Sequence, residues 1–394
     1  MASNILAPIM FPNTELPSFD EIFEDDDVNN LVFPNDDMVY IFKMEDLSEP
    51  SVIGSSMHVV RRYLHIPSGN FMAVKQIHVP VSRYLDEAKE KRLRKLNLEI
   101  HTHREIANSP YIVDFYGLCL HEGCALVCME LMDVSLHGLL TTCHNSGKNI
   151  PEDLLGYTAV SILEALKVCK SKGIIHRDVK PENILMKKSG EIKLADFGES
   201  RFVGESQKVT TIGAGTIRYW PPERLHTERT KYDIRSDIWS FGITLAEMAY
   251  GKYPIVHADF SDIDFQTVGF ITLQNRILEA NADEIINRCV RSKYSEDLCE
   301  FIWLCLQKLE DRVDVEELIE TELYERSQAR NTKWVVKLIL RALDEYDFTN
   351  DPNLYEKNDN FSAENNFYEP AKNTNHHFLP SISYKASSIS IIMG

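Results

Sequence analysis

Short blocks of apolar residues mark the first half of the chain, as they do in strands. Phe71–Ile77 is one such block, and the Pro-Ser-Gly-Asn sequence at 67–70 just before it is typical of a turn. Ala125–Met129 and Ile192–Ala195 are two further blocks of strand length. Residues 82–107 carry many charges with leucine and isoleucine at intervals, which predicts a helix.

The second half of the chain has helical periodicity. Over 151–172 apolar residues recur every three or four positions, with a proline at the start and a glycine just after the end. Beyond 235 the pattern is predominantly helical. Strands first and helices later predict an α+β fold, with a small β-rich N-terminal lobe over 47–130 and a larger helical C-terminal lobe over 131–325.

Negative charge is concentrated at the two ends of the chain. Of the net charge of −18, residues 1–50 contribute 12 acidic side chains and one basic one, and residues 344–394 contribute 8 acidic and 3 basic. The 40 acids and 38 bases between them are nearly balanced, which argues against a basic nucleic-acid groove. We therefore expect a disordered acidic arm over 1–46, with apolar residues between 22 and 33 available for local docking, and a disordered tail over 344–394.

The sequence has none of the usual features of a secreted or membrane-bound protein. No apolar run approaches the roughly 20 residues that cross a bilayer, and the first residues resemble neither a secretory signal nor a myristoylation site. The eight cysteines form no CxxC pair, so we expect buried thiols in a reducing compartment. The sequence predicts an intracellular protein of the cytoplasm, with the nucleus as a second location, that binds neither membrane nor nucleic acid.

The strongest chemical signal is a set of polar motifs in a fixed order. In chain order they are Lys75 on a predicted strand, His176-Arg177-Asp178, Lys180, Asn183, Asp196-Phe197-Gly198 and Pro221-Pro222-Glu223. Each short string could occur by chance, but their order and separation make coincidence remote. The set resembles the eukaryotic protein kinases, which carry a third-strand lysine, HRD…N, DFG and a closing APE.

The resemblance covers about residues 47–325 and implies a bilobal kinase fold with ATP and Mg²⁺ as cofactors. Phosphoryl transfer depends on positioning and on electrostatic stabilisation of spread charge. Asp178 is expected to accept or orient the proton of the substrate hydroxyl, and Lys180 to offer a cation to the γ-phosphate. Asn183 and Asp196 supply the hard oxygen ligands that Mg²⁺ prefers.

Lys75 is expected to contact the α- and β-phosphates. A desolvated lysine needs a counter-ion, because burial alone would lower its pKa. Glu99 is the expected partner, since it lies ten residues before Ser109, as in one branch of the family. Glu105, near the end of the predicted helix, is the alternative.

Two structural contacts and the nucleotide pocket follow from the same resemblance. Glu223 is expected to pair with Arg312, and Asp237 to steady the catalytic loop. The nucleotide pocket is expected to be formed by Ile53, Gly54, Val60, Ala73, Met129, Glu130, Met132 and Leu185. Ala73, a valine of the second strand and Leu185 are expected to enclose the adenine, with Met129 at the rear and the backbone of 130–132 meeting the adenine edge.

The segment 53–60, which would cover the phosphates and is called the phosphate lid below, departs from the kinase pattern. The family has G-x-G-x-x-G-x-V, but over 53–60 only Gly54 matches, Ser56 stands at the second glycine, and the loop is one residue short. This departure supports an alternative in which the protein is a catalytically weak pseudokinase or scaffold in MAP kinase signalling.

Several segments resemble the dual-specificity MAP kinase kinases in particular. These are residues 108–117 and 128–132, while 336–340 resembles the end of the stress-activated branch. Membership implies transfer of phosphate to Thr and Tyr in the activation loop of a MAP kinase, and activation by an upstream MAP kinase kinase kinase. The usual basic docking arm is missing from 1–50, so a serine/threonine kinase of another cascade tier stays open.

The same resemblance implies regulation by phosphorylation. Ser206 with Thr210, or with Thr211 as a rival, is expected to be phosphorylated in this chain's own activation loop, and Arg177 to receive a phosphate there. Residues 326–343 form a predicted amphipathic basic helix. That helix either packs on the C-terminal lobe or completes a docking site for the upstream kinase.

Overall fold

The structure is a computed structural model of the whole chain. It describes residues 26–34, 36–55, 59–79, 87–107, 109–203, 216–225, 233–255, 270–328 and 332–342. The chain divides into two units, residues 1–347 and 348–394, and every described residue belongs to the first. The tail predicted over 344–394 lies outside the described residues. None of the described helices combines the length and the hydrophobicity that spanning a bilayer requires.

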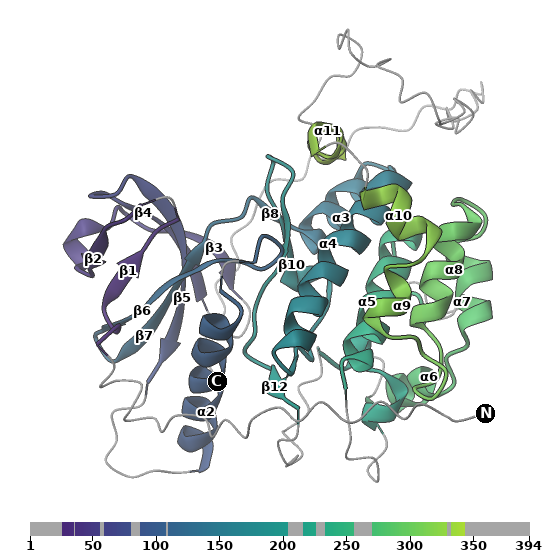
Figure 1. Cartoon of the computed structure of the whole chain (residues 1–394), viewed down its shortest axis with the longest axis horizontal. Coiled ribbons are helices and arrows are strands. Elements are labelled where there is room, and N and C mark those ends of the chain that lie inside the picture. The colour runs from purple at the N-terminus through teal and green to yellow at the C-terminus, as the bar shows by residue number, and fades with distance from the viewer. Residues whose placement is uncertain are drawn as a thin grey trace, which may run out of the picture. The chain divides into compact units, whose positions relative to one another are not determined.

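A five-stranded antiparallel sheet forms the N-terminal region (Figure 1). In spatial order its strands are β3 (Ser51–Ser55), β4 (Val59–His65), β5 (Asn70–His78), β7 (Cys124–Glu130) and β6 (Phe115–His121). One face packs against α2 (Glu87–Glu105), whose Leu96 and Ile100 meet Ile77 and Val127 of the sheet. The strands predicted from the apolar blocks at 71–77 and 125–129 are therefore confirmed.

The other face of the sheet is covered by a hairpin of β1 (Asn30–Val32) and β2 (Val39–Ile41), followed by the 3₁₀ turn η1 (Met44–Asp46). Leu31 and Phe33 are 0% and 2% exposed and belong to the apolar cluster on this face. The prediction of disorder over 1–46 is therefore wrong for 26–46, except for residue 35, which is not described, whereas the local docking considered for the apolar residues between 22 and 33 is seen for Leu31 and Phe33. The burial of two large side chains outweighs the acidic composition there. Residues 1–25 lie outside the described part.

The hairpin approaches β6 so closely that only glycine fits at position 117. A Cβ atom on Gly117 would lie 2.2 Å from the carbonyl oxygen of Asn30, which is a backbone atom with little room to move. Asn29 fastens the hairpin beside this point, because its backbone N–H donates to the Leu118 carbonyl at 2.8 Å and its Oδ1 accepts from Leu120 N–H at 2.8 Å.

Gly117→Ala is expected to destabilise the protein by about 1–3 kcal/mol, since the added methyl must displace backbone rather than a side chain. Urea unfolding of the full chain measures this change. Gly138→Ala on a helix is the matched control, because its new methyl meets only side-chain atoms of Val134 and Ser135. Equal unfolding midpoints for Gly117→Ala and the parent would contradict the close approach.

The C-terminal region is helical, as the periodicity predicted (Figure 1). Its helices are α3 (Leu136–Asn145), α4 (Glu152–Ser171), α5 (Arg235–Tyr250), α6 (Phe270–Leu278), α7 (Ala282–Cys289), α8 (Glu296–Cys305), α9 (Val315–Leu318), α10 (Glu322–Gln328) and α11 (Thr332–Ala342). Every residue of α5 from 236 to 249 is buried, so this helix lies in the middle of the helical region. Gly251 ends it with φ 84°, a conformation that glycine adopts without strain. The α+β fold class is confirmed.

Short strands and turns carry the polar motifs between these helices. They are β8 (Val134–Ser135), β9 (Ile174–Ile175), η2 (Pro181–Asn183), β10 (Ile184–Met186), β11 (Ile192–Leu194), β12 (Arg201–Phe202), η3 (Thr216–Tyr219) and η4 (Pro222–Leu225). β10 lies between β11 and β8, and β9 pairs with β12. The loop between β9 and β10 and the loop after β11 thus hold the two central motifs.

The predicted amphipathic helix at the end of the body is α11. Val335, Leu338 and Ile339 are buried in the large apolar cluster of the helical region, and the indole N–H of Trp334 donates to Asp153 of α4 at 3.0 Å. Packing on the C-terminal region is therefore what the structure shows for this helix.

Candidate active site

The loop between β9 and β10 is held by a buried carboxylate from α5. The two oxygens of Asp237 accept hydrogen bonds from the backbone N–H groups of His176 and Arg177, both at 2.7 Å. Arg177 has φ 68°, a left-handed conformation that costs energy for a non-glycine residue. These two charge-assisted bonds offset that cost, so Asp237 steadies the loop.

His176 links this loop to the strand that precedes the second motif. The Ala195 carbonyl can only accept, so Nε2 of His176 carries the hydrogen and donates at 3.1 Å. Nδ1 accepts from the backbone N–H of Asp178 at 3.2 Å. Burial lowers the pKa of His176, which keeps the ring in the neutral form that these two bonds require.

Asp178 has one carboxylate oxygen engaged and one open. Oδ2 accepts from Nζ of Lys180 at 2.7 Å and from Nδ2 of Asn183 at 2.9 Å, and Nδ2 of Asn183 also donates to the Asp178 carbonyl at 2.8 Å. Oδ1 is buried and has no hydrogen-bond partner among the described residues. A buried acceptor without a partner is costly, so this oxygen suits a substrate hydroxyl that would donate to it.

Burial raises the pKa of Asp178 to about 6, against the opposing pull of Lys180. A carboxyl that accepts a proton must be ionised, so kcat/KM is expected to fall about tenfold per pH unit below pH 6 and to level off above it. A pH profile of kcat/KM at constant ionic strength measures this. Nucleotide affinity at each pH serves as the control, and a flat profile between about pH 5 and 7 would contradict the assignment.

Lys75 on β5 joins the two regions through two ion pairs. Its Nζ lies 2.8 Å from Oε1 of Glu99 on α2 and 2.8 Å from Oδ1 of Asp196, which follows β11. Burial by itself would lower the pKa of Lys75, but the two carboxylates raise it above its ordinary value, so the amine stays charged. Oε2 of Glu105, the alternative partner, instead lies 3.6 Å from Nζ of Lys172.

The Asp196 carboxylate is open to the site, with 45% of its side chain exposed. Its surroundings partly desolvate it, yet Lys75 holds its pKa below the ordinary value, so it is ionised at neutral pH. Gly198 leaves the necessary room, since a Cβ there would lie 3.3 Å from both Oδ1 of Asp196 and Oε2 of Glu99.

The residues present fit a magnesium–nucleotide complex better than a protein-only metal cage. Across the described ranges, no group of three or more His, Cys, Asp and Glu side chains gathers around a metal position. Mg²⁺ is commonly held by one or two protein ligands together with phosphate oxygens and water. Asp196 offers a carboxylate, and Asn183, whose amide NH₂ is turned to Asp178, offers its Oδ1.

Apart from Met132, the predicted nucleotide-pocket residues come from strands on both sides of the connection between the two regions. Ala73 on β5 is buried and lies opposite Met129 on β7, and Leu185 is on β10. Ile53 on β3 is exposed, and Val60 on β4 pairs with Gly54. Residues 56–58 of the divergent lid lie outside the described residues.

The side chain of Glu130 is held by two lysines and is not free to bind a nucleotide. Its carboxylate is buried and ion-paired with Lys187 and, at 2.7 Å, with Lys193, while its backbone N–H donates to the Asp114 carbonyl at 2.9 Å. Its side chain is thus committed to joining β7 to the β10–β11 pair. Met132 lies two residues beyond it, where the chain leaves β7.

Sequence reasoning missed His103 of α2. Its ring stacks on the ring of Phe115, with the two centroids 5.5 Å apart. It also packs edge to face with Phe197, the middle residue of the Asp-Phe-Gly motif, with the centroids 5.3 Å apart. Burial lowers the pKa of His103 to about 4, so the ring is neutral at physiological pH. The available signal was its position four residues after Glu99, which places both on one helix face.

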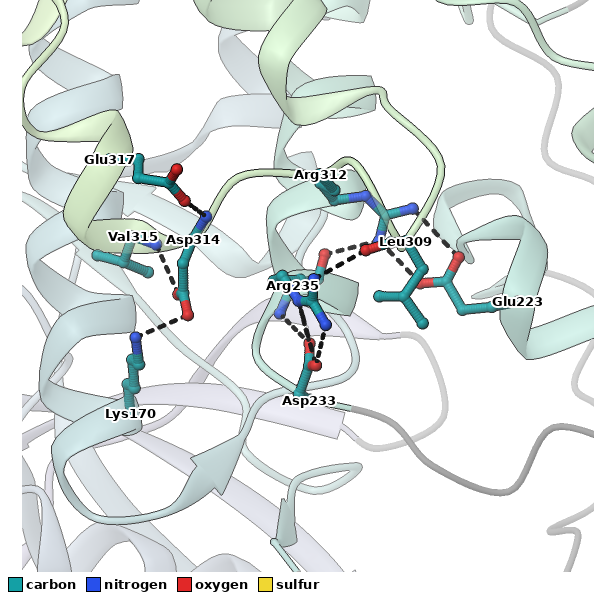
Figure 2. Close-up of polar contacts among 9 residues, drawn as sticks. All are labelled: Lys170, Glu223, Asp233, Arg235, Leu309, Arg312, Asp314, Val315 and Glu317. Atoms are coloured by element: carbon teal, nitrogen blue, oxygen red, sulfur yellow. Dashed lines mark hydrogen bonds and ion pairs between the residues drawn. The ribbon is translucent and has the colours of Figure 1, made fainter. Parts of the chain in front are cut away.

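The predicted pair of Glu223 and Arg312 is present deep in the helical region (Figure 2). Nη1 and Nη2 of Arg312 donate to the two carboxylate oxygens at 2.7 and 3.1 Å, which is a bidentate arrangement. Arg312 also donates to the carbonyls of Gln307 and Arg235. The candidate phosphorylation sites Ser206, Thr210 and Thr211 lie outside the described residues.

Two comparisons with known proteins bear on this site. A family model described as the protein kinase domain matches residues 51–324. A curated relative, the dual specificity mitogen-activated protein kinase kinase sek-1 of Caenorhabditis elegans, is 34% identical over 278 residues, which are 70% of this chain and 76% of the relative. The stretch 51–324 matched by the family model contains all the polar motifs described above from Lys75 to Arg312.

Proposed function

The chain belongs to the protein kinase family and, within it, to the dual-specificity MAP kinase kinases, and on that basis we propose that it phosphorylates Thr and Tyr in the activation loop of a MAP kinase. The observation that carries the catalytic part is the geometry of Asp178, whose Oδ1 is buried without a partner while Oδ2 is fixed by Lys180 and Asn183. An oxygen fixed in this way can orient a hydroxyl and accept its proton.

The other polar side chains of the site would compensate the charges of the phosphates and of the metal. When bound, MgATP supplies the γ-phosphoryl group and the metal that neutralises its charge. Lys75 is kept charged and is placed by Glu99 to meet phosphate oxygens, while Asp196 and Asn183 would hold the metal. Lys180, already 2.7 Å from Asp178, can reach both the base and the transferred group. This intact arrangement favours an enzyme over the scaffold alternative suggested by the divergent lid.

We propose that phosphorylation of this chain's own activation loop regulates its kinase activity by adding negative charge. Phosphate on Ser206 together with Thr210 or Thr211, placed by an upstream MAP kinase kinase kinase, would add negative charge near Arg177 of the catalytic loop. A stress-type cascade, with the protein in the cytoplasm and also in the nucleus, is the setting that the sequence favours.

The test is phosphate mapping on a kinase-dead MAP kinase incubated with the full chain, MgATP and the activating changes Ser206→Asp and Thr210→Asp. We expect phosphate on both the Thr and the Tyr of the substrate loop, and none when Asp178→Asn is added. Phosphate on Thr alone would contradict dual specificity. Phosphate on no MAP kinase, together with phosphorylation of a general serine peptide, would place the chain in another cascade tier.

A further inference from the structure

The N-terminal hairpin of β1 and β2 exposes an apolar face. Val32 lies opposite Val39, and Ile41 follows two residues later on the same side, while Leu31 points to the opposite, buried side. Val32, Val39 and Ile41 are 50%, 57% and 70% exposed, and the adjoining Met38 is 59% exposed. We call these four residues the hairpin patch. Contiguous exposed apolar groups of this kind mark interaction sites more often than chance.

The hairpin patch lies on a rigid support. Asn29 receives a hydrogen bond from Phe42 N–H at 2.7 Å, in addition to its two bonds with β6, and Phe33 anchors the far end of β1 in the core. A surface that is already ordered loses little conformational entropy on binding. The patch is therefore suited to capture a partner and is not a loosely attached arm.

The hairpin and the residues that flank it along the chain are strongly acidic. Residues 26–49 contain seven acidic side chains, and Lys43 is their one basic residue. This charge argues against three occupants, two of them segments of this chain and the third a second copy of it. Residues 1–25 have no Lys or Arg, residues 344–394 have a net negative charge, and the hairpin patch of a second copy would bring like charges together.

We propose that the hairpin patch docks an extended segment of a partner protein that carries both basic residues and alternating aliphatic residues. Its cations complement the acidic residues of 26–49, and alternate residues of an extended chain lie on one face, where they can cover Val32, Val39 and Ile41. The hairpin precedes the stretch 51–324 matched by the general kinase-domain model, so this surface is additional to the catalytic domain. The proposal does not depend on which substrate the kinase phosphorylates.

The experiment uses a fluorescein-labelled peptide of four arginines followed by three leucines at alternate positions, titrated with the full chain and followed by anisotropy. We expect saturable binding that weakens at high salt, and a loss of at least about tenfold in affinity for the double change Val39→Thr and Ile41→Thr. Threonine keeps the β-branched shape on an exposed strand, so the fold is expected to survive, which the thermal midpoint checks. Ile271→Thr on α6 is the matched control, because Ile271 is also 70% exposed.

Four results would overturn the proposal. The first is absence of binding by the parent chain, and the second is binding that the double change leaves intact or that Ile271→Thr reduces equally. The third is binding that appears only after residues 1–25 are removed, which would make this chain's own arm the occupant. The fourth is a dimer that the double change dissociates in sedimentation, which would make a second copy the occupant. A peptide with glutamates in place of the arginines is expected not to bind.

Discussion

Asp178→Asn is expected to lower the rate of the phosphoryl-transfer step by about 10²–10⁴-fold while the protein stays folded. The asparagine side chain has the same shape, and its carbonyl oxygen can still accept from Lys180. The position of Oδ1, which has no partner within the described part of the chain, would then hold either an NH₂ group or an uncharged oxygen, and neither accepts a proton well. Single-turnover kinetics with the activated kinase measures the step directly.

Asp178→Asn is not expected to lower the thermal stability of the protein, although it lowers the activity. Burial of the Asp178 carboxylate raises its pKa, which means that the folded state pays to keep it ionised at neutral pH. Removing this charge is therefore expected to leave the thermal midpoint unchanged or slightly higher. Asp233→Asn serves as the control, because Asp233 pairs with Arg235 in a partly exposed ion pair outside the catalytic loop. A loss of activity accompanied by unfolding, or equal losses in both variants, would contradict a role as catalytic base.

The convergence of the motif residues could be predicted from the sequence because the chemistry of phosphoryl transfer restricts residue type and spacing together. Lys75 and Asp196 are 121 positions apart, yet their side chains meet at 2.8 Å, as the motif order required. The choice of Glu99 over Glu105 rested on a spacing within one helix, and the ion pair with Lys75 agrees with it. Motifs of this kind constrain the fold strongly because one misplaced member would leave a buried charge unpaired.

The parts that sequence reasoning misjudged depend on tertiary contacts that composition does not record. Residues 26–46 look disordered because acids dominate them, but Leu31 and Phe33 find a complementary sheet face. The side-chain contacts of Glu130 could not be predicted either, because Lys187 and Lys193 from later in the chain determine where its carboxylate points. Both cases concern which neighbour a side chain meets, which only the folded chain specifies.

Arg312→Met is expected to destabilise the protein by about 3–5 kcal/mol, which is the largest change in stability predicted here. The pair with Glu223 is almost fully enclosed, with 0% and 3% of the two side chains exposed. Removing the cation leaves the Glu223 carboxylate buried without compensation, and the carbonyls of Gln307 and Arg235 lose a donor. Urea unfolding of the full chain measures the difference in the free energy of unfolding.

Adding Glu223→Leu to Arg312→Met should recover part of that loss, because the uncompensated charge is gone and an apolar pair can fill the space. Full recovery is not expected, since the two carbonyls still lack their donor. Lys170→Met supplies the comparison in the same part of the helical region. Nζ of Lys170 lies 2.8 Å from Oδ2 of Asp314, with 29% and 33% of the two side chains exposed (Figure 2), and Lys170 also pairs with Glu316, whose side chain is 58% exposed. Solvent compensates such exposed pairs, so their loss should cost less than about 1 kcal/mol. Equal costs for Arg312→Met and Lys170→Met would show that burial does not govern the strength of the Glu223–Arg312 pair.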